Sequence, residues 1–397
     1  MDHISDRLNR LSESQTLAMT RRSRELRAKG LDVINLSIGE PDFDTPDFIK
    51  QAAVDAIQNN HTHYPPVPGY EDLLQAIADK FKRDNDLDYS LSQIVVSTGA
   101  KQSLANLVLS LVNPGDEVIL PAPFWVTYME LVKLAEGKPV ILDTGLNQDF
   151  KVTAKQIASA ITSKTKLIMF SSPCNPSGSA YTRKELEDIA AVIAENKSVY
   201  VISDEIYEHI LYNGSHFSIA SIAEVKDQVI TVNGVSKGFA MTGWRIGYMG
   251  APDWIAKACN KIQGQFTSGA STISQKAAVA ALKADPSVTH EMKEIFLKRR
   301  DLLLDLLKEI EGLQTNVPQG AFYVFPDVSS YFGKSHGNDS INNANDLCLY
   351  LLNQAHVALV PGEAFGTPGY IRISYACSEE QLKEAAKRIK TALDNLQ

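Results

Sequence analysis

Short apolar runs separated by stretches of helical length dominate the middle of the chain. Six such runs are typical of buried strands, at residues 94–97, 117–120, 139–142, 167–171, 199–203 and 228–232. A seventh strand is predicted in GWRIGYMG, and helices are predicted between most of the runs, at 101–112, 124–135, 154–161 and 183–195. Strands that alternate with helices in this way predict a mostly parallel, seven-stranded sheet with helices on both faces.

The two ends of the chain follow a different pattern. Residues 5–29 are polar and compatible with a helix, whereas a long amphipathic helix around 302–310 precedes short strands in GAFYVFPD, VALVPG and YIRISYA. We therefore predict an α/β fold with a second, smaller α+β domain. The predicted parts are an N-terminal arm (1–45) that joins the small domain, a large domain (46–285) and the small C-terminal domain (286–397).

Composition and charge exclude several classes of protein. The net charge of −8 over 397 residues, without a dense basic run, argues against a nucleic-acid binder. The four cysteines are scattered and form no CxxC pair, so we expect a reducing compartment and no metal site. Because no stretch resembles a signal core or is long enough to cross a bilayer, we expect a cytoplasmic protein without a membrane partner.

Candidate chemistry centres on VSKGFAMTGWRIGY at 235–248. Lys237 is the kind of side chain that forms a Schiff base with an aldehyde, provided that its surroundings are desolvated and electropositive. Ser236 and Arg245, the latter on a predicted strand, supply donors that suit a phosphate monoester. Pyridoxal phosphate carries both an aldehyde and a phosphate. An isolated Ser-Lys pair is more often a surface lysine, so the prediction depends on the rest of the chain.

Further polar residues follow other predicted strands, where open α/β sheets bind ligands. The turn at 97–101 leads from a strand into a helix, whose N-terminus can bind phosphate, although glycine is common in such turns. Asp204 could pair with a pyridine nitrogen or be a helix cap. Asn175 could donate to a ring oxygen or stabilise an Asn-Pro turn, and Trp125 could stack on a heterocycle or belong to the core.

Taken jointly, GEPDFDTP, NPSG, SDEIYEH, SKGFAMTGWRIGY and YIRISYA resemble the motifs of the class I aspartate-aminotransferase family. The resemblance runs from about residue 5 to the C-terminus. It implies the fold of the dimeric pyridoxal-phosphate transferases, with active sites shared between the two subunits of a homodimer. It also implies a cofactor site made of Gly99, Ala100, Lys101, Trp125, Asn175, Asp204, Tyr207, Ser236, Lys237, Arg245 and, from the other subunit, Tyr64.

The resemblance assigns a role to most of these residues. It implies that Lys237 binds the cofactor aldehyde and later moves a proton, and that Asp204 contacts the pyridine nitrogen. Tyr207 and Asn175 are expected on the ring oxygen, and Trp125 on the ring face. The residues expected around the phosphate are Gly99, Ala100, Ser236, Arg245 and, from the other subunit, Tyr64.

The substrate is expected to bind through its carboxylates. Arg372 matches the arginine that binds the α-carboxylate, and Lys101, in GAKQ where a related subfamily has GGKQ, is the candidate for a distal carboxylate. The resemblance thus implies a substrate site made of Gly39, Trp125, Asn175, Arg372, Lys101, Ser14 and Thr16.

These residues predict an aspartate:2-oxoglutarate aminotransferase that acts on amino acid and 2-oxo acid substrates. The amino group would pass through pyridoxal and pyridoxamine phosphate in a ping-pong reaction. Transamination of aromatic amino acids, alanine or prephenate is the alternative within the fold; relatives that accept prephenate-derived acids carry a basic residue near position 12, where this chain has Ser12. A non-catalytic ligand sensor is the alternative from another class, but no basic DNA-binding stretch fits before residue 30.

Overall fold

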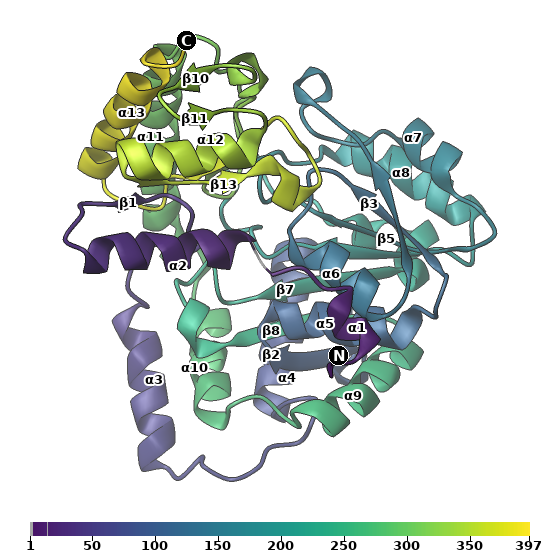
Figure 1. Ribbon diagram of the computed structural model, residues 1–397. Helices are drawn as coiled ribbons and strands as arrows, with labels where there is room; N and C mark the ends of the chain where they lie inside the picture. The colour runs from purple at the N-terminus through teal and green to yellow at the C-terminus, as the bar shows by residue number, and fades with distance from the viewer. Residues whose placement is uncertain (1–2, 14) are drawn as a thin grey trace.

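The computed structural model describes residues 3–13 and 15–397, and within them it contains a seven-stranded sheet (Figure 1). In spatial order its strands are β2 (Ile94–Thr98), β8 (Ile246–Gly250), β7 (Val229–Gly234), β6 (Tyr200–Asp204), β5 (Thr165–Ser171), β3 (Glu117–Pro121) and β4 (Lys138–Leu142). Neighbouring strands are parallel except at β8, which is antiparallel to both β2 and β7. The mostly parallel sheet predicted from the apolar runs is therefore confirmed.

Helices cover both faces of this sheet, as alternate apolar side chains of each strand require. Val95 and Val118 belong to one core, with helices α5 (Ala100–Leu111), α6 (Thr127–Leu134) and α9 (Asp253–Phe266). Val96 and Ile119, the next residues along the same strands, belong to the opposite core. The helices of that core are α3 (Asp47–Gln58), α4 (Glu71–Asn85), α7 (Ala154–Ala160), α8 (Arg183–Glu195) and α10 (Thr272–Lys283).

A smaller group of elements packs around its own apolar core. Its strands are β1 (Ile34–Asn35), β9 (Tyr323–Val324), β10 (Ser335–His336), β11 (Asp339–Ser340), β12 (Val357–Ala358), β13 (Val360–Pro361) and β14 (Ile371–Ser374). Its helices are α2 (Gln15–Ala28), α11 (His290–Lys308), α12 (Ala344–Tyr350) and α13 (Glu379–Asp394). The antiparallel order β13-β14-β9 and the parallel pair β1-β12 bring the N-terminal arm next to the C-terminal strands (Figure 1).

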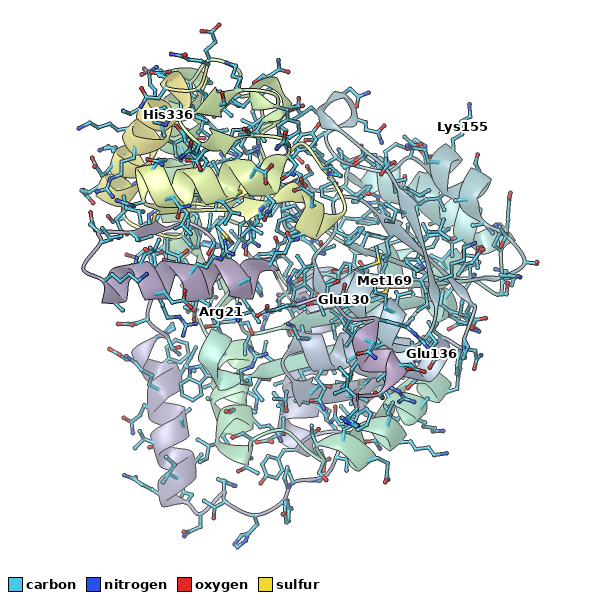
Figure 2. All side chains as sticks on the ribbon, in the orientation of Figure 1. Arg21, Glu130, Glu136, Lys155, Met169 and His336 are labelled. Carbon is cyan, nitrogen blue, oxygen red and sulfur yellow. The ribbon has the colours of Figure 1, made fainter. Side chains whose placement is uncertain are left out.

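Residues before α2 lie against the large sheet unit instead. The short helix α1 (Asp6–Asn9) lies beside α6, Arg10 forms an ion pair with Glu136 at 3.4 Å, and the backbone N–H of Ser12 donates to Glu130 Oε2 at 2.8 Å. Figure 2 labels both glutamates, one in α6 and one just after it. The helical character predicted over 5–29 is therefore divided between two helices that pack on different parts of the molecule.

The segment 253–283 forms two helices, α9 and α10, and Gly269 lies in the turn between them. One residue differs from the predicted pattern. Arg245 precedes β8 rather than lying in it, because its backbone is left-handed, with φ of 57°, and cannot continue a strand. In the described part of the chain, no helix is long and apolar enough to cross a membrane.

A buried ion pair fixes the loop that follows β6 to helix α4. Lys80 is fully buried and contacts Glu208, whose carboxylate also accepts hydrogen bonds from the amides of Asn85 at 2.6 Å and Asn233 at 2.8 Å. Burial raises the pKa of Glu208, but Lys80, together with His209, His216 and the Asn85 amide, outweighs it, and the pKa lies below its usual value. Because both partners are buried, removing one leaves an unpaired charge.

Lys80→Met is therefore expected to destabilise the fold by about 3–5 kcal/mol at pH 7. The loss should shrink as the pH falls below the ordinary pKa of a glutamate, because Glu208 then takes up a proton and needs no cation. Urea unfolding midpoints at pH 7 and pH 4 measure both effects. Lys184→Met, which breaks an exposed pair with Asp188, is the control and should change little; an equal loss in both variants would contradict this account.

Candidate active site

A cavity of about 260 Å³ opens at the carboxyl edge of the large sheet. Residues at the ends of β2, β5, β6 and β7 line it, together with residues of the N-terminal arm and of the smaller unit. Of the predicted site residues, it brings together Thr16, Gly39, Ala100, Lys101, Trp125, Asn175, Asp204, Tyr207, Ser236, Lys237, Arg245 and Arg372. Segments that are far apart in the sequence thus meet at one site, as ligand sites in open α/β folds do.

Lys237 contributes an amine to the lining of this cavity. It lies three residues after β7, and its Nζ donates a hydrogen bond to the carbonyl oxygen of Gly39 at 2.5 Å. Burial lowers the pKa of Lys237 to about 8; Glu40 opposes this shift, and the guanidinium groups of Arg372 and Arg245 add to it. A substantial fraction of the amine is therefore unprotonated near neutral pH, as a nucleophile or base requires.

Asp204 ends β6 with a carboxylate that is 5% exposed. Its Oδ2 accepts a hydrogen bond from the Tyr128 hydroxyl at 2.7 Å, and its Oδ1 accepts one from the N–H of Ile206 at 3.3 Å. Burial raises the pKa of Asp204 to about 6 in spite of these two donors. Three residues further on, the hydroxyl of Tyr207 lies 2.8 Å from that of Tyr323, so two phenols flank the same cavity.

The turn between β2 and α5 forms a cradle for an anion. Gly99 has φ of 80°, and a Cβ there would lie 2.5 Å from the guanidinium of Arg245. Across the turn, a Cβ on Gly247 would lie 2.0 Å from the backbone nitrogen of Ala100, so only glycine allows β8 to approach so closely. The first N–H groups of α5 lack intrahelical acceptors. Together with Ser236 and Arg245, they are the donors that a phosphate requires.

Arg372 is a buried guanidinium from β14. Its two terminal nitrogens donate to Asn175 Oδ1 at 2.9 Å and to the carbonyl of Ser37 at 2.6 Å, and its Nε has no partner among the described residues. The group lies over the rings of Tyr323 and Phe365, at 4.6 and 5.1 Å from their centroids. No carboxylate in the described part of the chain pairs with it, so an anionic ligand would satisfy a buried charge.

Lys101 and Thr16 line the cavity, whereas the predicted residues Ser14 and Tyr64 are not among its described lining residues. Lys101 is placed over the Trp125 ring, 5.0 Å from its centroid, and burial followed by the charge of Arg245 lowers its pKa. Thr16 lines the cavity from α2, whereas Ser14 lies outside the described residues. Tyr64 is 96% exposed and does not line the cavity of its own chain.

The charges of the lining fit pyridoxal phosphate and a carboxylate substrate. Among the described residues that line the cavity, Lys101, Lys237, Arg245 and Arg372 face the single carboxylate of Asp204. Lys101 and Arg245 are exposed, but the buried charge of Arg372 is costly unless anions enter. A phosphate at the α5 cradle and a carboxylate at Arg372 would supply them, and the amine of Lys237 lies in the same cavity to bind an aldehyde.

Some lining residues were not predicted from the sequence. They include Leu17, Tyr128, Ser171, Thr242 and Tyr323. A signal was available for Tyr128, because it lies three residues after Trp125 in the same PFWVTY segment and so about one helical turn away. Tyr323 comes from GAFYVF, whose apolar pattern predicts only a buried strand.

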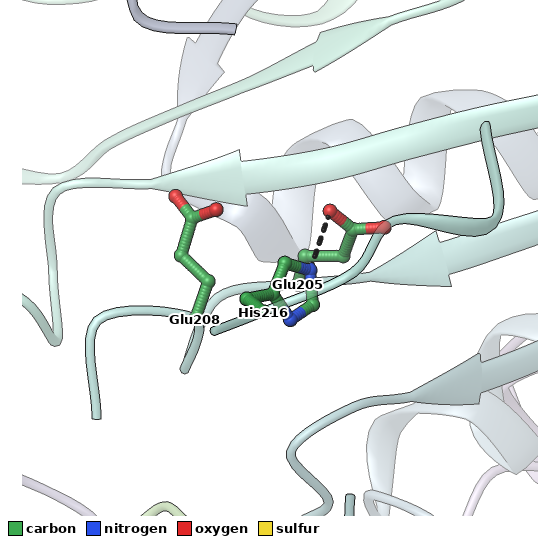
Figure 3. Close-up of side chains that lie close together, drawn as sticks. All are labelled: Glu205, Glu208 and His216. Carbon is green, nitrogen blue, oxygen red and sulfur yellow. Dashed lines mark ion pairs between the residues drawn. The ribbon is translucent and has the colours of Figure 1, made fainter. Parts of the chain in front are cut away.

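A second polar cluster lies behind the site and has partners of its own. Glu205, Glu208 and His216 place possible metal ligands close together, and Figure 3 shows the ion pair between Glu205 and His216, 3.0 Å long. The other oxygen of Glu205 accepts hydrogen bonds from the hydroxyls of Ser203 and Ser218 at 2.9 and 2.6 Å. The carboxylate of Glu208 is bound by Lys80 and by the amides of Asn85 and Asn233.

Fold and cavity together are those of an α/β protein whose lining lysine and buried arginine could hold a flat, anionic aldehyde and an anionic substrate. The model of the family "Aminotransferase class I and II" matches residues 31–389. The chain therefore belongs to the class I and II aminotransferase family, whose cofactor is pyridoxal phosphate and whose substrates are amino acids and oxo acids.

Similar proteins cover the whole chain. A bifunctional aspartate aminotransferase and glutamate/aspartate-prephenate aminotransferase of Petunia hybrida is 50% identical, over 98% of this chain and 82% of that protein. A probable aspartate/prephenate aminotransferase of Rickettsia bellii is 47% identical over 100% of both chains. The crystal structure of the aspartate aminotransferase from Rhizobium meliloti superposes with a TM-score of 0.96 at 43% identity, with 100% of both chains covered.

The pKa of Lys237 predicts how the protein takes up pyridoxal phosphate. Because the unprotonated amine is the reactive form, the uptake rate of the apoprotein should rise about tenfold per pH unit below pH 8 and level off above it. Stopped-flow absorbance after mixing measures the rate. An ordinary lysine would continue to gain rate up to about pH 10, and such a profile would contradict the assigned surroundings of Lys237.

Proposed function

We propose that the protein is an aspartate:2-oxoglutarate aminotransferase and that the cavity described above is its active site. The observation that carries this proposal is the pair of cations at separate places in one cavity: Arg372 on β14 and Lys101 on α5. Aspartate, oxaloacetate and 2-oxoglutarate all carry two carboxylates, so both cations would find a partner in each substrate. The similar proteins whose names include aspartate support the same substrate.

Pyridoxal phosphate, when bound, withdraws electrons from the substrate carbon that carries the amino group. Asp204 would hold a proton at the ring nitrogen, and the Tyr207 hydroxyl and the amide of Asn175 would donate to the ring oxygen. The oxygen of Asn175 already accepts from Arg372, so its NH₂ group is the half that donates to a ligand. Trp125 would cover the ring face, and Gly99, Ala100, Ser236 and Arg245 would hold the phosphate.

Substrate binding orients the bond that breaks. Arg372 would bind the α-carboxylate with the help of the Gly39 backbone, and Lys101 and Thr16 would receive the distal carboxylate. The Nζ of Lys237, which is partly unprotonated, would then be placed to take the proton from Cα. Over the two stages of the reaction, aspartate would give up its amino group and leave as oxaloacetate, and 2-oxoglutarate would receive that group and leave as glutamate.

The substrate assignment is tested by measuring one half-reaction in the unmodified protein and in the Lys101→Ala variant. Purified protein loaded with pyridoxal phosphate and mixed with L-aspartate should change its cofactor absorbance rapidly and release oxaloacetate, whereas L-alanine and L-phenylalanine react slowly. Lys101→Ala removes the charge that meets the distal carboxylate, worth about 1.5–3 kcal/mol. It should therefore lower kcat/KM for aspartate roughly ten- to a hundredfold and leave alanine almost unchanged. Faster conversion of phenylalanine would reassign the substrate, and no conversion by any amino acid would contradict the proposed reaction.

Prephenate is the second candidate acceptor, because two of the similar proteins described above are named for it. Position 12, where related enzymes of that type carry a basic residue, is Ser12 here, and its backbone donates to Glu130. The second half-reaction distinguishes the two acceptors. Enzyme that has already reacted with aspartate is mixed with prephenate or with 2-oxoglutarate, and the rates at which the cofactor absorbance returns are compared.

We also propose a homodimer in which each subunit completes the other's site, and a division into a large domain (46–285) and a small domain (286–397 with the arm 1–45). Apolar side chains exposed along α3, Phe48, Val54 and Ile57, support a subunit interface nearby. The 96% exposed Tyr64 supports a contribution to the partner's phosphate site.

Tyr64→Phe is expected to weaken pyridoxal phosphate binding, because a hydrogen bond to a charged phosphate is lost, by roughly ten- to a hundredfold. Fluorescence titration of the apoprotein measures the dissociation constant, and light scattering gives the mass. His63→Ala, at the neighbouring and exposed position, is the control. A monomer, or a Tyr64→Phe protein with unchanged affinity, would contradict the shared site.

A further inference from the structure

The contact between Tyr128 and Asp204 has no part in the scheme above. Tyr128 stands in the first turn of α6 and is 1% exposed. Its hydroxyl donates to Asp204 Oδ2 at 2.7 Å, while the ring meets the Trp125 indole edge-on, with centroids 5.8 Å apart and planes at 90°. One side chain therefore contacts both the carboxylate and the aromatic ring that face the cofactor space.

The contact is arranged so that the proton stays on Tyr128. Burial, and then the charge of Asp204, raise the pKa of Tyr128 well above its usual value, so the phenol remains a donor. Burial raises the pKa of Asp204 to about 6, and the Tyr128 hydrogen bond is the largest influence that opposes this rise. The other groups that act on Asp204 are the N–H of Ile206, the neighbouring Glu205 and, across the cavity, Lys237. Tyr128 in turn faces Cys174 and Ser171.

We propose that Tyr128 is a positioning residue, which fixes the Asp204 carboxylate and holds it ionised so that it can keep the ring nitrogen of the cofactor protonated. The inference rests on the proposed function, because it assumes that Asp204 meets that nitrogen. Hydrogen bonds to ionised groups are among the stronger ones in proteins, and a donor in a dry site cannot be replaced by bulk water. The backbone donor of Ile206 is longer, at 3.3 Å, and does not substitute for the hydroxyl.

Tyr128→Phe tests this, because it keeps the ring beside Trp125 and removes only the hydroxyl. The affinity of the apoprotein for pyridoxal phosphate, measured by fluorescence titration from pH 5 to 9 without any amino acid, should fall where Asp204 becomes protonated. In Tyr128→Phe this fall should begin roughly one to two pH units higher than in the unmodified protein. At pH 7, kcat of the aspartate half-reaction should drop roughly ten- to a hundredfold with little change in KM, because Arg372 and Lys101 are intact.

Two comparisons separate this role from simple loss of packing. Tyr89→Phe removes a hydroxyl that is also buried, 3.2 Å from Thr231 Oγ1 and outside the cavity, and should leave the pH profile of binding unchanged. In an Asp204→Asn background, Tyr128→Phe should add almost no further loss, because no carboxylate remains to be held.

A Tyr128→Phe profile that coincides with that of the unmodified protein, or a full additional loss in the Asp204→Asn background, would overturn the proposal. An unmodified protein that binds no pyridoxal phosphate at any pH would instead overturn the proposed function on which it rests. The two failures are therefore distinguishable in the same titration.

Discussion

An excess of positive charge in one cavity is the constraint on which the rest of the structure depends. The half-buried amine of Lys237 and the buried guanidinium of Arg372 share this space with Arg245 and Lys101, and Asp204 is the one carboxylate among the described lining residues. Charges that repel one another in such surroundings persist only if the scaffold holds them. The excess of positive charge attracts anionic ligands. Burial, with smaller contributions from Arg372 and Arg245, lowers the pKa of Lys237 to about 8.

The scaffold holds these groups through contacts that take no part in the proposed reaction. The glycines at 99 and 247 let β8 and the α5 turn approach closely enough for Arg245 to face the helix N-terminus. The Lys80–Glu208 pair anchors the loop after β6, which carries Asp204 at its start and Tyr207 in its middle. Tyr207 in turn packs into the core of the smaller unit, against Tyr323 of β9, and β9 pairs with the strand that carries Arg372.

Much of this arrangement could be predicted from sequence because it follows from local pattern. Apolar runs predicted the seven strands, and polar residues directly after parallel strands had to meet at one edge of the sheet, which brought Asp204, Asn175 and Lys237 together. The left-handed backbone of Arg245 was not predictable in this way, since its neighbours in GWRIGYMG have strand-like composition. Tyr128 and Tyr323 were not predicted as site residues, because the hydrogen-bond partners of their hydroxyls, Asp204 and Tyr207, are distant in sequence. An apolar pattern does not indicate which group a hydroxyl contacts.

The central claim is that Lys237 is the amine at which the cofactor's aldehyde binds, and chemical trapping tests it most directly. The protein is mixed with pyridoxal phosphate, reduced with borohydride and digested, and the modified peptide is identified by mass spectrometry. The account predicts a single modified peptide that contains Lys237, with Lys101 and the exposed lysines unmodified. Modification of Lys101 or of several surface lysines, with Lys237 unmodified, would contradict it.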